Sequence, residues 1–420
     1  MTGASLRLPR IGPMRWQRLG WTDALVLLLA CKPLADAVSE RGRDTQLDAG
    51  TAWTAAALLA LVIWLVLPRT ARAETWTLAA SVIAILGFGA VQMLWQAGPE
   101  ALVESAKVAA GFAPAVILLD ATRRPEIRRS LRRWAAVFVA SLGVHVGVAW
   151  LQFFGLVSTT YQQAGSGRPS GLYFHPVTLG YVLVAALLVI AVLHQRRQVA
   201  TWLGLPLAGL VTLTIVIGTH RTSVIAALLV IGWWLLSSTV RWQRFHLRSL
   251  VFTTLLTSLL VIASVVTLPL WVGAAKRAAS GVTSVVTSGD LDPTSDRFLR
   301  GRGQRWDAAL ETMATAMVAE RLVGFGYQVV DPHSDYLRLP LVHGVLGSLL
   351  VLTALGFFWL SAFRQADLLG TAWLTAALTA MALFAITTKP TSYPSFIWAW
   401  TVVAAVACAS RRDAQGQNTR

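Results

Sequence analysis

One histidine stands between two carboxylates in a short polar segment that leads into an apolar run. The segment reads Asp331-Pro-His333-Ser-Asp335-Tyr336. A carboxylate close to an imidazole can orient the ring and raise its basicity. An imidazole held in this way can take a proton from a hydroxyl group. We therefore predict that His333 is a general base, against the alternative of an exposed loop histidine without a chemical role.

Basic side chains in neighbouring loops could bind a phosphate group. The planar fork of an arginine matches phosphate oxygens in two-pronged contacts. Two of the arginines begin a predicted helix, where exposed backbone N–H groups also favour anions. The alternative is that these arginines face the phosphates of membrane lipids. The candidate cations are Arg168, Arg221, Arg302, Arg305 and Lys389.

A loop rich in glycine and serine, Gly165 to Pro176, contains Arg168 and His175. Glycine lets a backbone approach a ligand closely, so we expect this loop to contribute His175 to substrate binding. Arg221 lies in a much shorter loop, as a fixed charge between two apolar runs. Both loops are predicted to open on the same side of a membrane as His333.

The composition decides what kind of protein positions these groups. Hydrophobic residues make up 55% of the 420 residues and charged residues only 13%. A soluble globular protein carries roughly 25% charged residues, and a disordered chain needs low hydrophobicity, so both classes are excluded. The net charge of +16 is attributed to membrane topology, and no nucleic acid is expected as a partner. The two cysteines, Cys31 and Cys408, form no C-x-x-C pair and predict neither a disulfide framework nor a zinc site.

The fold expected is an all-α polytopic membrane protein with about twelve spans, because a spanning helix needs ~20 mostly apolar residues. Two of the spans contain pairs of opposite charge, Lys32 with Asp36 and Glu104 with Lys107, which can neutralise each other on one helix face. The predicted spans are 19–37, 51–67, 75–96, 101–120, 134–156, 173–194, 200–218, 222–240, 249–272, 337–360, 367–387 and 392–409.

Lysines and arginines are distributed unequally between the two sides of these spans. The tails and alternate loops of one side carry 21 of them, and the short loops of the other side carry 5. This bias places both termini in the cytoplasm. The domains expected are a cytoplasmic tail (1–18), spans one to nine (19–272), a long non-cytoplasmic loop (273–336), spans ten to twelve (337–409) and a second cytoplasmic tail (410–420).

The long loop is expected to contain an amphipathic helix from Gln304 to Val323. Its apolar residues recur at helical spacing, and Gly324 and Gly326 mark its end. We expect the helix to lie on the membrane surface or to cap the bundle. The apolar positions are Trp306, Leu310, Met313, Met317 and Leu322.

Four stretches of this sequence, taken together, resemble the O-antigen ligase family, which is related to the O-antigen polymerases. They keep the family's order and fall on one predicted side of the membrane. The last contains a histidine, a small polar residue, a Tyr-Leu step and a closing glycine, as the family signature does. The stretches are Gly167 to Gly180, Thr219 to Ser223, Gly301 to Leu310 followed by Gly324-Phe-Gly326, and His333 to Gly347.

The resemblance implies a glycosyltransferase of GT-C-like architecture in the bacterial inner membrane, with a periplasmic active site. Its donor would be an O-antigen linked to undecaprenyl diphosphate, its acceptor a sugar hydroxyl of lipid A–core, and membrane lipids would surround it. His333 would be the base, and Arg221 and Arg302 would bind the diphosphate with help from Arg168, Arg305 and Lys389. Tyr336 would shape the acceptor site.

Neither a cofactor nor a metal is expected, because guanidinium groups can take up the charge of a diphosphate leaving group. With one base and no evident nucleophile, the anomeric centre should invert. The short D-x-D step at Asp290 and Asp292 is the alternative, since metal-dependent sugar transferases use such a step. O-antigen polymerase and a ligase that glycosylates proteins remain open on the same fold. A polar-lipid transporter is the alternative from another class.

Overall fold

The chain folds as an all-α, multi-pass membrane protein, apart from one antiparallel pair of two-residue strands. The computed structural model describes residues 20–41, 49–66, 73–96, 98–124, 131–159, 162–163, 166–173, 175–239, 302–326 and 331–409. The two predicted tails, the predicted span 249–272 and the Asp290/Asp292 step lie outside these residues.

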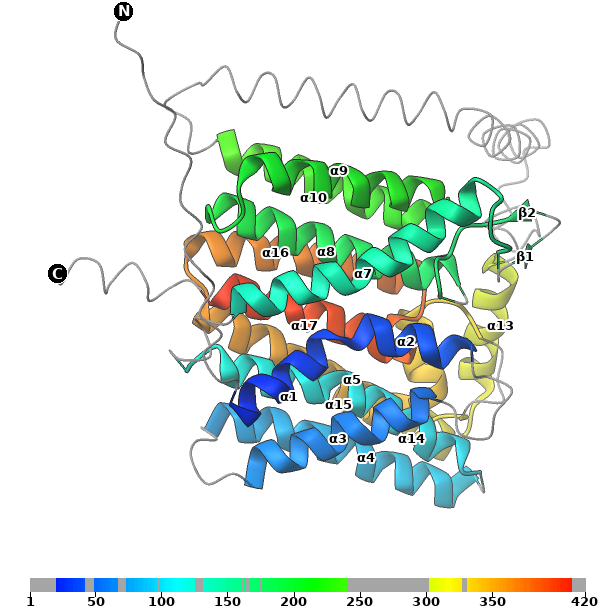
Figure 1. Ribbon diagram of the computed structural model, residues 1–420. Coiled ribbons are helices and arrows are strands. Elements are labelled where there is room, and N and C mark those ends of the chain that lie inside the picture. The colour runs from blue at the N-terminus through cyan, green and yellow to red at the C-terminus, as the bar shows by residue number, and fades with distance from the viewer. Residues whose placement is uncertain are drawn as a thin grey trace, which may run out of the picture.

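Most of the described helices lie side by side and run across the molecule in Figure 1. The order of elements is α1 Trp21–Ala30, α2 Lys32–Arg41, α3 Ala49–Val66, α4 Ala73–Gln96, α5 Glu100–Ala121, α7 Leu131–Phe153, β1 Gln162–Gln163, β2 Ser166–Gly167, α8 Pro176–Gln195, α9 Thr201–Ile217, α10 Arg221–Thr239, α13 Arg302–Thr315, α14 Val318–Val323, α15 Asp335–Gln365, α16 Leu368–Thr387, the 3-10 turn η2 Pro390–Ser392, and α17 Pro394–Cys408.

Within the described residues, seven helices are long and apolar enough to cross a membrane, and three shorter helices are apolar as well. The first predicted span, 19–37, is wrong as a single helix. It consists of α1 and α2, which are separated at Cys31, and α2 begins with Lys32-Pro33. A proline lacks the N–H that a continuing helix needs, so a break beside it is expected. The count of twelve spans stays a prediction.

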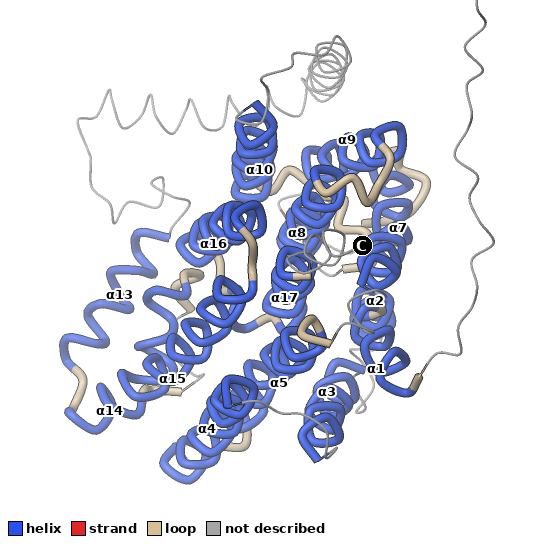
Figure 2. Tube along the Cα trace, turned by 90° about the vertical axis from the view of Figure 1, so that its left-hand side faces the viewer, coloured by secondary structure: helices blue, strands red, loops and turns tan. Residues whose placement is uncertain are grey.

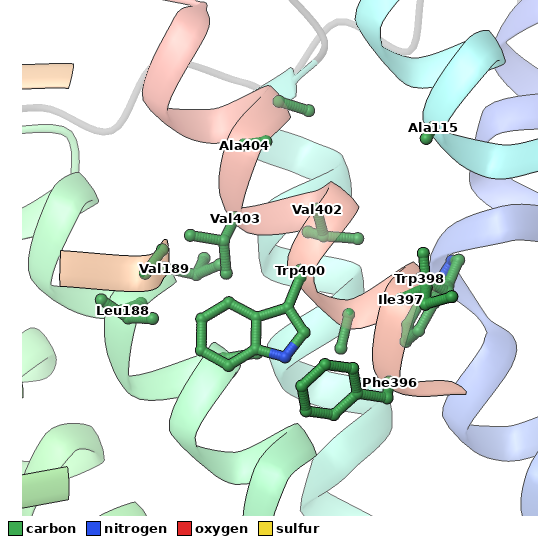
Figure 3. Close-up of a cluster of buried hydrophobic side chains, with 14 of the residues drawn as sticks. Ala115, Leu188, Val189, Phe396, Ile397, Trp398, Trp400, Val402, Val403 and Ala404 are labelled. Atoms are coloured by element: carbon green, nitrogen blue, oxygen red, sulfur yellow. The ribbon is translucent and has the colours of Figure 1, made fainter. Parts of the chain in front are cut away.

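The centre of the bundle is formed by α8 and α17, which are apolar on all sides and almost completely buried. A helix that is hydrophobic all round belongs in such an interior position. Figure 3 shows Trp400 and Phe396 of α17 in this cluster, together with Leu188 and Val189 of α8. The fold thus encloses two helices that are far apart in the sequence.

One end of the bundle, here called the site end, carries the loops that contain Arg168, Arg221 and Lys389. It is the right-hand end of Figure 1. There α13 runs crosswise to the long helices (Figure 1), and Figure 2 shows it at the edge of the bundle, next to α14 and α15. The single helix predicted from Gln304 to Val323 is wrong in one respect: it is interrupted at Ala316 and Met317, between α13 and α14. Its predicted end at Gly324 is confirmed, since that glycine is the C-cap of α14.

The tenth predicted span, 337–360, falls within α15 but contains a break at Gly344, whose φ is 62° and ψ is −172°. The segment after α14 lies against this break. The backbone N–H groups of Phe325 and Gly326 donate to the carbonyl oxygens of Leu341 and Val342, at 2.9 and 3.1 Å. A buried glutamine, Gln92 of α4, also donates to the Val342 oxygen, at 3.0 Å. Backbone N–H and C=O groups that lose their intrahelical hydrogen bonds inside a membrane need such partners, because no water is present to replace them.

The opposite charges predicted to pair within a span do so. The ammonium of Lys32 contacts Asp36, and both side chains are buried. The second oxygen of Asp36 accepts a hydrogen bond from Ser395 at 2.7 Å, which ties α2 to the start of α17. Lys107 and Glu104 pair at 2.6 Å and are partly exposed.

Candidate functional site

The loop before α15 presents His333 in a left-handed backbone conformation. Its φ is 51°, a value that is uncommon outside glycine, asparagine, aspartate and histidine. Two of the contacts that hold the loop are hydrogen bonds: the His333 N–H donates to Oδ1 of Asp331 at 3.0 Å, and the indole of Trp306 donates to the Pro332 carbonyl at 2.9 Å. The first of these is the side-chain-to-backbone bond by which aspartate builds tight turns. The second docks α13 onto this loop.

The carboxylate of Asp331 lies between an imidazole and an ammonium. Its Oδ2 is 3.5 Å from Nδ1 of His333 and also contacts Nζ of Lys389. The His333 side chain is 44% exposed, so a substrate can reach it. The predicted carboxylate beside the imidazole is thus confirmed for Asp331, which can hold the ring with Nδ1 inward.

The prediction that Asp335 also neighbours the imidazole is wrong. Asp335 is buried, and its carboxylate accepts hydrogen bonds from the backbone N–H and the hydroxyl of Thr391, both at 2.8 Å. The buried Arg338 lies 3.9 Å from the same carboxylate. Residues two apart at the beginning of a helix point in different directions, and here only Asp331 faces the histidine.

His175 lies close enough to His333, Arg168 and Lys389 to be affected by the charge of each. Burial lowers the pKa of His175 to about 4, and the positive charges of those three residues contribute to the same shift. Its Nδ1 accepts a hydrogen bond from the Val177 N–H at 3.2 Å, which caps α8. The imidazole of His175 is therefore neutral at pH 7.

The glycine-serine loop that carries Arg168 is held by hydrogen bonds from its backbone to the side chain of Gln152, at the end of α7. Its side-chain oxygen accepts from the N–H groups of Ser170 and Gly171, and its nitrogen donates to the Gly171 carbonyl, all at 2.9 Å. Gly171 has φ +65°, and a Cβ there would lie 2.6 Å from the His145 carbonyl. Here the glycine is required by close backbone packing, whereas the sequence suggested that it served close approach to a ligand.

The remaining predicted residues lie at the same end without a described contact to this group. The side chains of Arg221, Arg305 and Tyr336 are exposed. Arg221 begins α10, which is joined to α16 by a hydrogen bond of 2.8 Å between Thr222 and Thr387, two residues before Lys389. Arg302 is the first residue of α13, and its side chain lies outside the described part of the chain.

Two other residues of the stretch Thr219 to Ser223, His220 and Ser223, serve packing. Nδ1 of His220 and the hydroxyl of Ser223 are 2.7 Å apart, and the His220 ring lies parallel to that of Phe384, with 6.4 Å between the ring centroids. A Cβ at Gly180 would overlap Ser223, so this glycine allows α8 and α10 to approach closely. Only Arg221 of that stretch projects as an exposed charge.

The structure therefore brings together His333, Asp331, Lys389, His175 and Arg168, which come from three loops. Sequence reasoning missed Gln152 and Thr391, which no local pattern marks because their partners are distant in the chain. It also missed Arg338, although its partner Asp335 is only three residues away. Within the described ranges, no group of three or more His, Cys, Asp or Glu side chains is placed to hold a metal ion. The chain matches no known family model, and no curated protein matches it.

The pairing of Asp331 predicts a specific dependence of stability on pH. Burial alone would raise the pKa of Asp331, but the hydrogen bonds from Lys389 and the His333 backbone, with the charges of both residues, outweigh it and lower the pKa below 3.8. The stabilisation is then complete above the pKa of an unfolded aspartate, about 3.9, and is lost as the pH falls through the lower folded value.

Thermal unfolding of the wild type and Asp331→Asn in detergent, between about pH 3 and pH 8, tests this dependence. The difference in melting temperature should shrink as the pH falls below about 5, because Asp331 is then protonated. Any change between about pH 6 and pH 8 should reflect the charge on His333 and should disappear in a His333→Asn background. A difference that does not shrink in acid would contradict the pairing of Asp331.

Proposed function

We propose that the protein is an O-antigen ligase: a GT-C-like glycosyltransferase with twelve spans, both termini in the cytoplasm and its active site at the periplasmic face of the bacterial inner membrane. It transfers a glycan from undecaprenyl diphosphate to a sugar hydroxyl of lipid A–core. The observation that carries the proposal is the position of His333 and Asp331 among cations at one end of a membrane-embedded bundle. A base, an orienting carboxylate and a cationic surface are what this transfer needs.

His333 removes the proton from the acceptor hydroxyl as its oxygen bonds to the anomeric carbon of the donor sugar. Asp331 orients the ring through Nδ1, which leaves Nε2 to receive the proton. The bond from the anomeric carbon to the phosphate oxygen breaks, and its electron pair leaves with the diphosphate. One base and direct displacement invert the anomeric centre.

The cations stabilise the negative charge that collects on the leaving diphosphate. Arg221 and Arg305 present exposed guanidinium groups, and Arg302 stands at the beginning of α13, where backbone N–H groups also favour phosphate. Arg168 adds a charge beside His175. The neutral His175 can donate a hydrogen bond to the substrate without adding to the repulsion among these groups. Tyr336 contributes an exposed aromatic surface to the acceptor side.

The proposed reaction can be tested with purified protein, a defined glycan on undecaprenyl diphosphate, and an excess of metal chelator. With rough lipopolysaccharide as acceptor, we expect a capped product whose formation the chelator does not reduce. Elongation of the lipid-linked repeat units instead would identify a polymerase, and transfer to a protein would identify a protein ligase. A strict requirement for a divalent metal would contradict the proposed role of the guanidinium groups.

A polar-lipid transporter is the second candidate. Interrupted helices and intramembrane charges are features of transporters, and this bundle has breaks at Cys31 and Gly344 and a buried Lys32–Asp36 pair. In liposomes that contain only the protein and a fluorescent lipid-linked glycan, a transporter would move the glycan to the other leaflet unchanged. A ligase would leave its sidedness unaltered and would consume it only after an acceptor is added.

A further inference from the structure

Two segments far apart in the chain are joined where the site is built. The backbone N–H of Asp335 donates to the Thr388 carbonyl at 3.0 Å. The carboxylate of Asp335 accepts from the N–H and the hydroxyl of Thr391, 56 residues away. The segment that leads into α15 is therefore attached on both sides of Lys389, which lies with Pro390 between the two threonines.

The hydrogen bonds between Asp335 and Thr391 are buried, whereas the side chains that they position are partly exposed to solvent. Asp335 and Thr391 are each 3% exposed, but the side chains of His333, Asp331 and Lys389 are 44%, 32% and 26% exposed. Hydrogen bonds to a charged acceptor are stronger than those between neutral groups, above all where water is excluded. Arg338, 3.9 Å away and also buried, offsets the charge of the Asp335 carboxylate.

Lys389 is held by this attachment in a position from which its ammonium meets Asp331. The same Oδ2 of Asp331 faces Nδ1 of His333. A chain of contacts therefore connects Asp335 to the imidazole. Asp335 binds Thr391, whose backbone continues through Pro390 to Lys389. Lys389 contacts Asp331, which faces His333. Pro390 and the turn η2 lie within the connecting backbone and restrict its movement.

We propose that Asp335 is a positioning residue for the transfer reaction: through Thr391 it fixes Lys389 against Asp331 and so sets the orientation of the His333 ring. The inference rests on the proposed function for its effect on catalysis. Its structural part, the control of Lys389 by Asp335, can be measured without any substrate. Asp335 itself touches none of the reacting atoms.

The substrate-free test measures how fast Lys389 reacts with a trace amount of an acylating reagent, by mass spectrometry of its peptide. An amine held against a carboxylate reacts more slowly than a free one. Asp335→Asn should increase the rate at Lys389 about two- to fivefold, the change expected on releasing a partly exposed ion pair. Lys107, paired with Glu104 outside the site, is the internal reference and should not change.

Thr391 supplies variants that keep the carboxylate in place. Thr391→Val replaces the hydroxyl with a methyl group and should increase the acylation rate of Lys389 by less than Asp335→Asn does. Thr391→Ser keeps the hydroxyl and should react at the wild-type rate.

In the transferase assay, Asp335→Asn should reduce kcat about 10- to 100-fold, the cost of a misplaced catalytic group, with little change in KM. Asp367→Asn, which alters the N-cap of α16 at the other end of the bundle, is the matched control.

The results separate this inference from the proposed function. If Lys389 becomes more reactive but no variant or wild-type protein transfers a glycan, the positioning role stands and the proposed reaction fails. If the Lys389 rate is unchanged in folded Asp335→Asn and Thr391→Val, the positioning role is overturned, whatever the activity. A fall in kcat that Thr391→Ser shares equally with Thr391→Val would overturn it too.

Discussion

Replacing Gly324 with alanine is expected to leave little folded protein in the membrane. Gly324 has φ 91° and ψ 170°, and Gly344, which it faces, has φ 62° and ψ −172°. This conformation is essentially restricted to glycine. A Cβ on Gly324 would also overlap the backbone of Val342 and Gly344. Strain and overlap together should cost about 3 to 5 kcal/mol, a large part of the stability of a typical domain.

The measurement is the amount and melting temperature of monodisperse protein after extraction in detergent. Gly356→Ala is the matched control, because Gly356 lies in α15, the helix that contains Gly344, with open space around the added methyl group. That control should be neutral or slightly stabilising, since alanine favours a helix over glycine by about 1 kcal/mol. Normal yield and melting temperature for Gly324→Ala would show that the two glycines do not meet as described.

Replacing His333 with asparagine is expected to abolish transfer while the protein stays folded. Asparagine tolerates a positive φ better than most residues, so the loop can keep its turn onto Asp331. An amide, however, cannot accept the proton of the acceptor hydroxyl. Loss of a general base lowers the rate by about 10²- to 10⁴-fold. The measurement is product formation with donor and acceptor at saturation.

The control for this variant is His194→Asn, a change of the same kind at the end of α8 remote from the site. It should retain wild-type transfer. Binding of the lipid-linked donor should survive in His333→Asn, because the cations that face the diphosphate are untouched. Wild-type rates in folded His333→Asn would remove the imidazole from the mechanism.

The sequence was informative wherever the signal is local. Apolar runs located most helices to within a few residues, as for 101–120 against Glu100–Ala121 and 367–387 against Leu368–Thr387. The ion pair of Lys32 with Asp36 follows from their spacing of four on one helix. The neighbourhood of Asp331 and His333 likewise depends on a two-residue turn. In each case, the residues that decide the outcome are neighbours in the chain.

Features that depend on distant partners could not be predicted. The break in α15 lies inside a predicted span, and the partners supplied by Phe325, Gly326 and Gln92 satisfy its backbone groups. Asp335 resembles Asp331 as a neighbour of the histidine, yet a threonine 56 residues away decides where its carboxylate points. Hydropathy and spacing carry no information about such pairings.

The burial of α8 on all sides has a consequence for biosynthesis. Its neighbours in the finished bundle include α16 and α17, which the ribosome makes much later. Until they emerge, a helix destined for the interior must rest against acyl chains or against a chaperone that shields it. An early α8 tolerates this because its surface is as apolar as lipid. The bundle can therefore close only after the last spans have been made. A nascent chain that ends before α17 would lack Ser395, and with it the hydrogen bond to Asp36 of the Lys32–Asp36 pair.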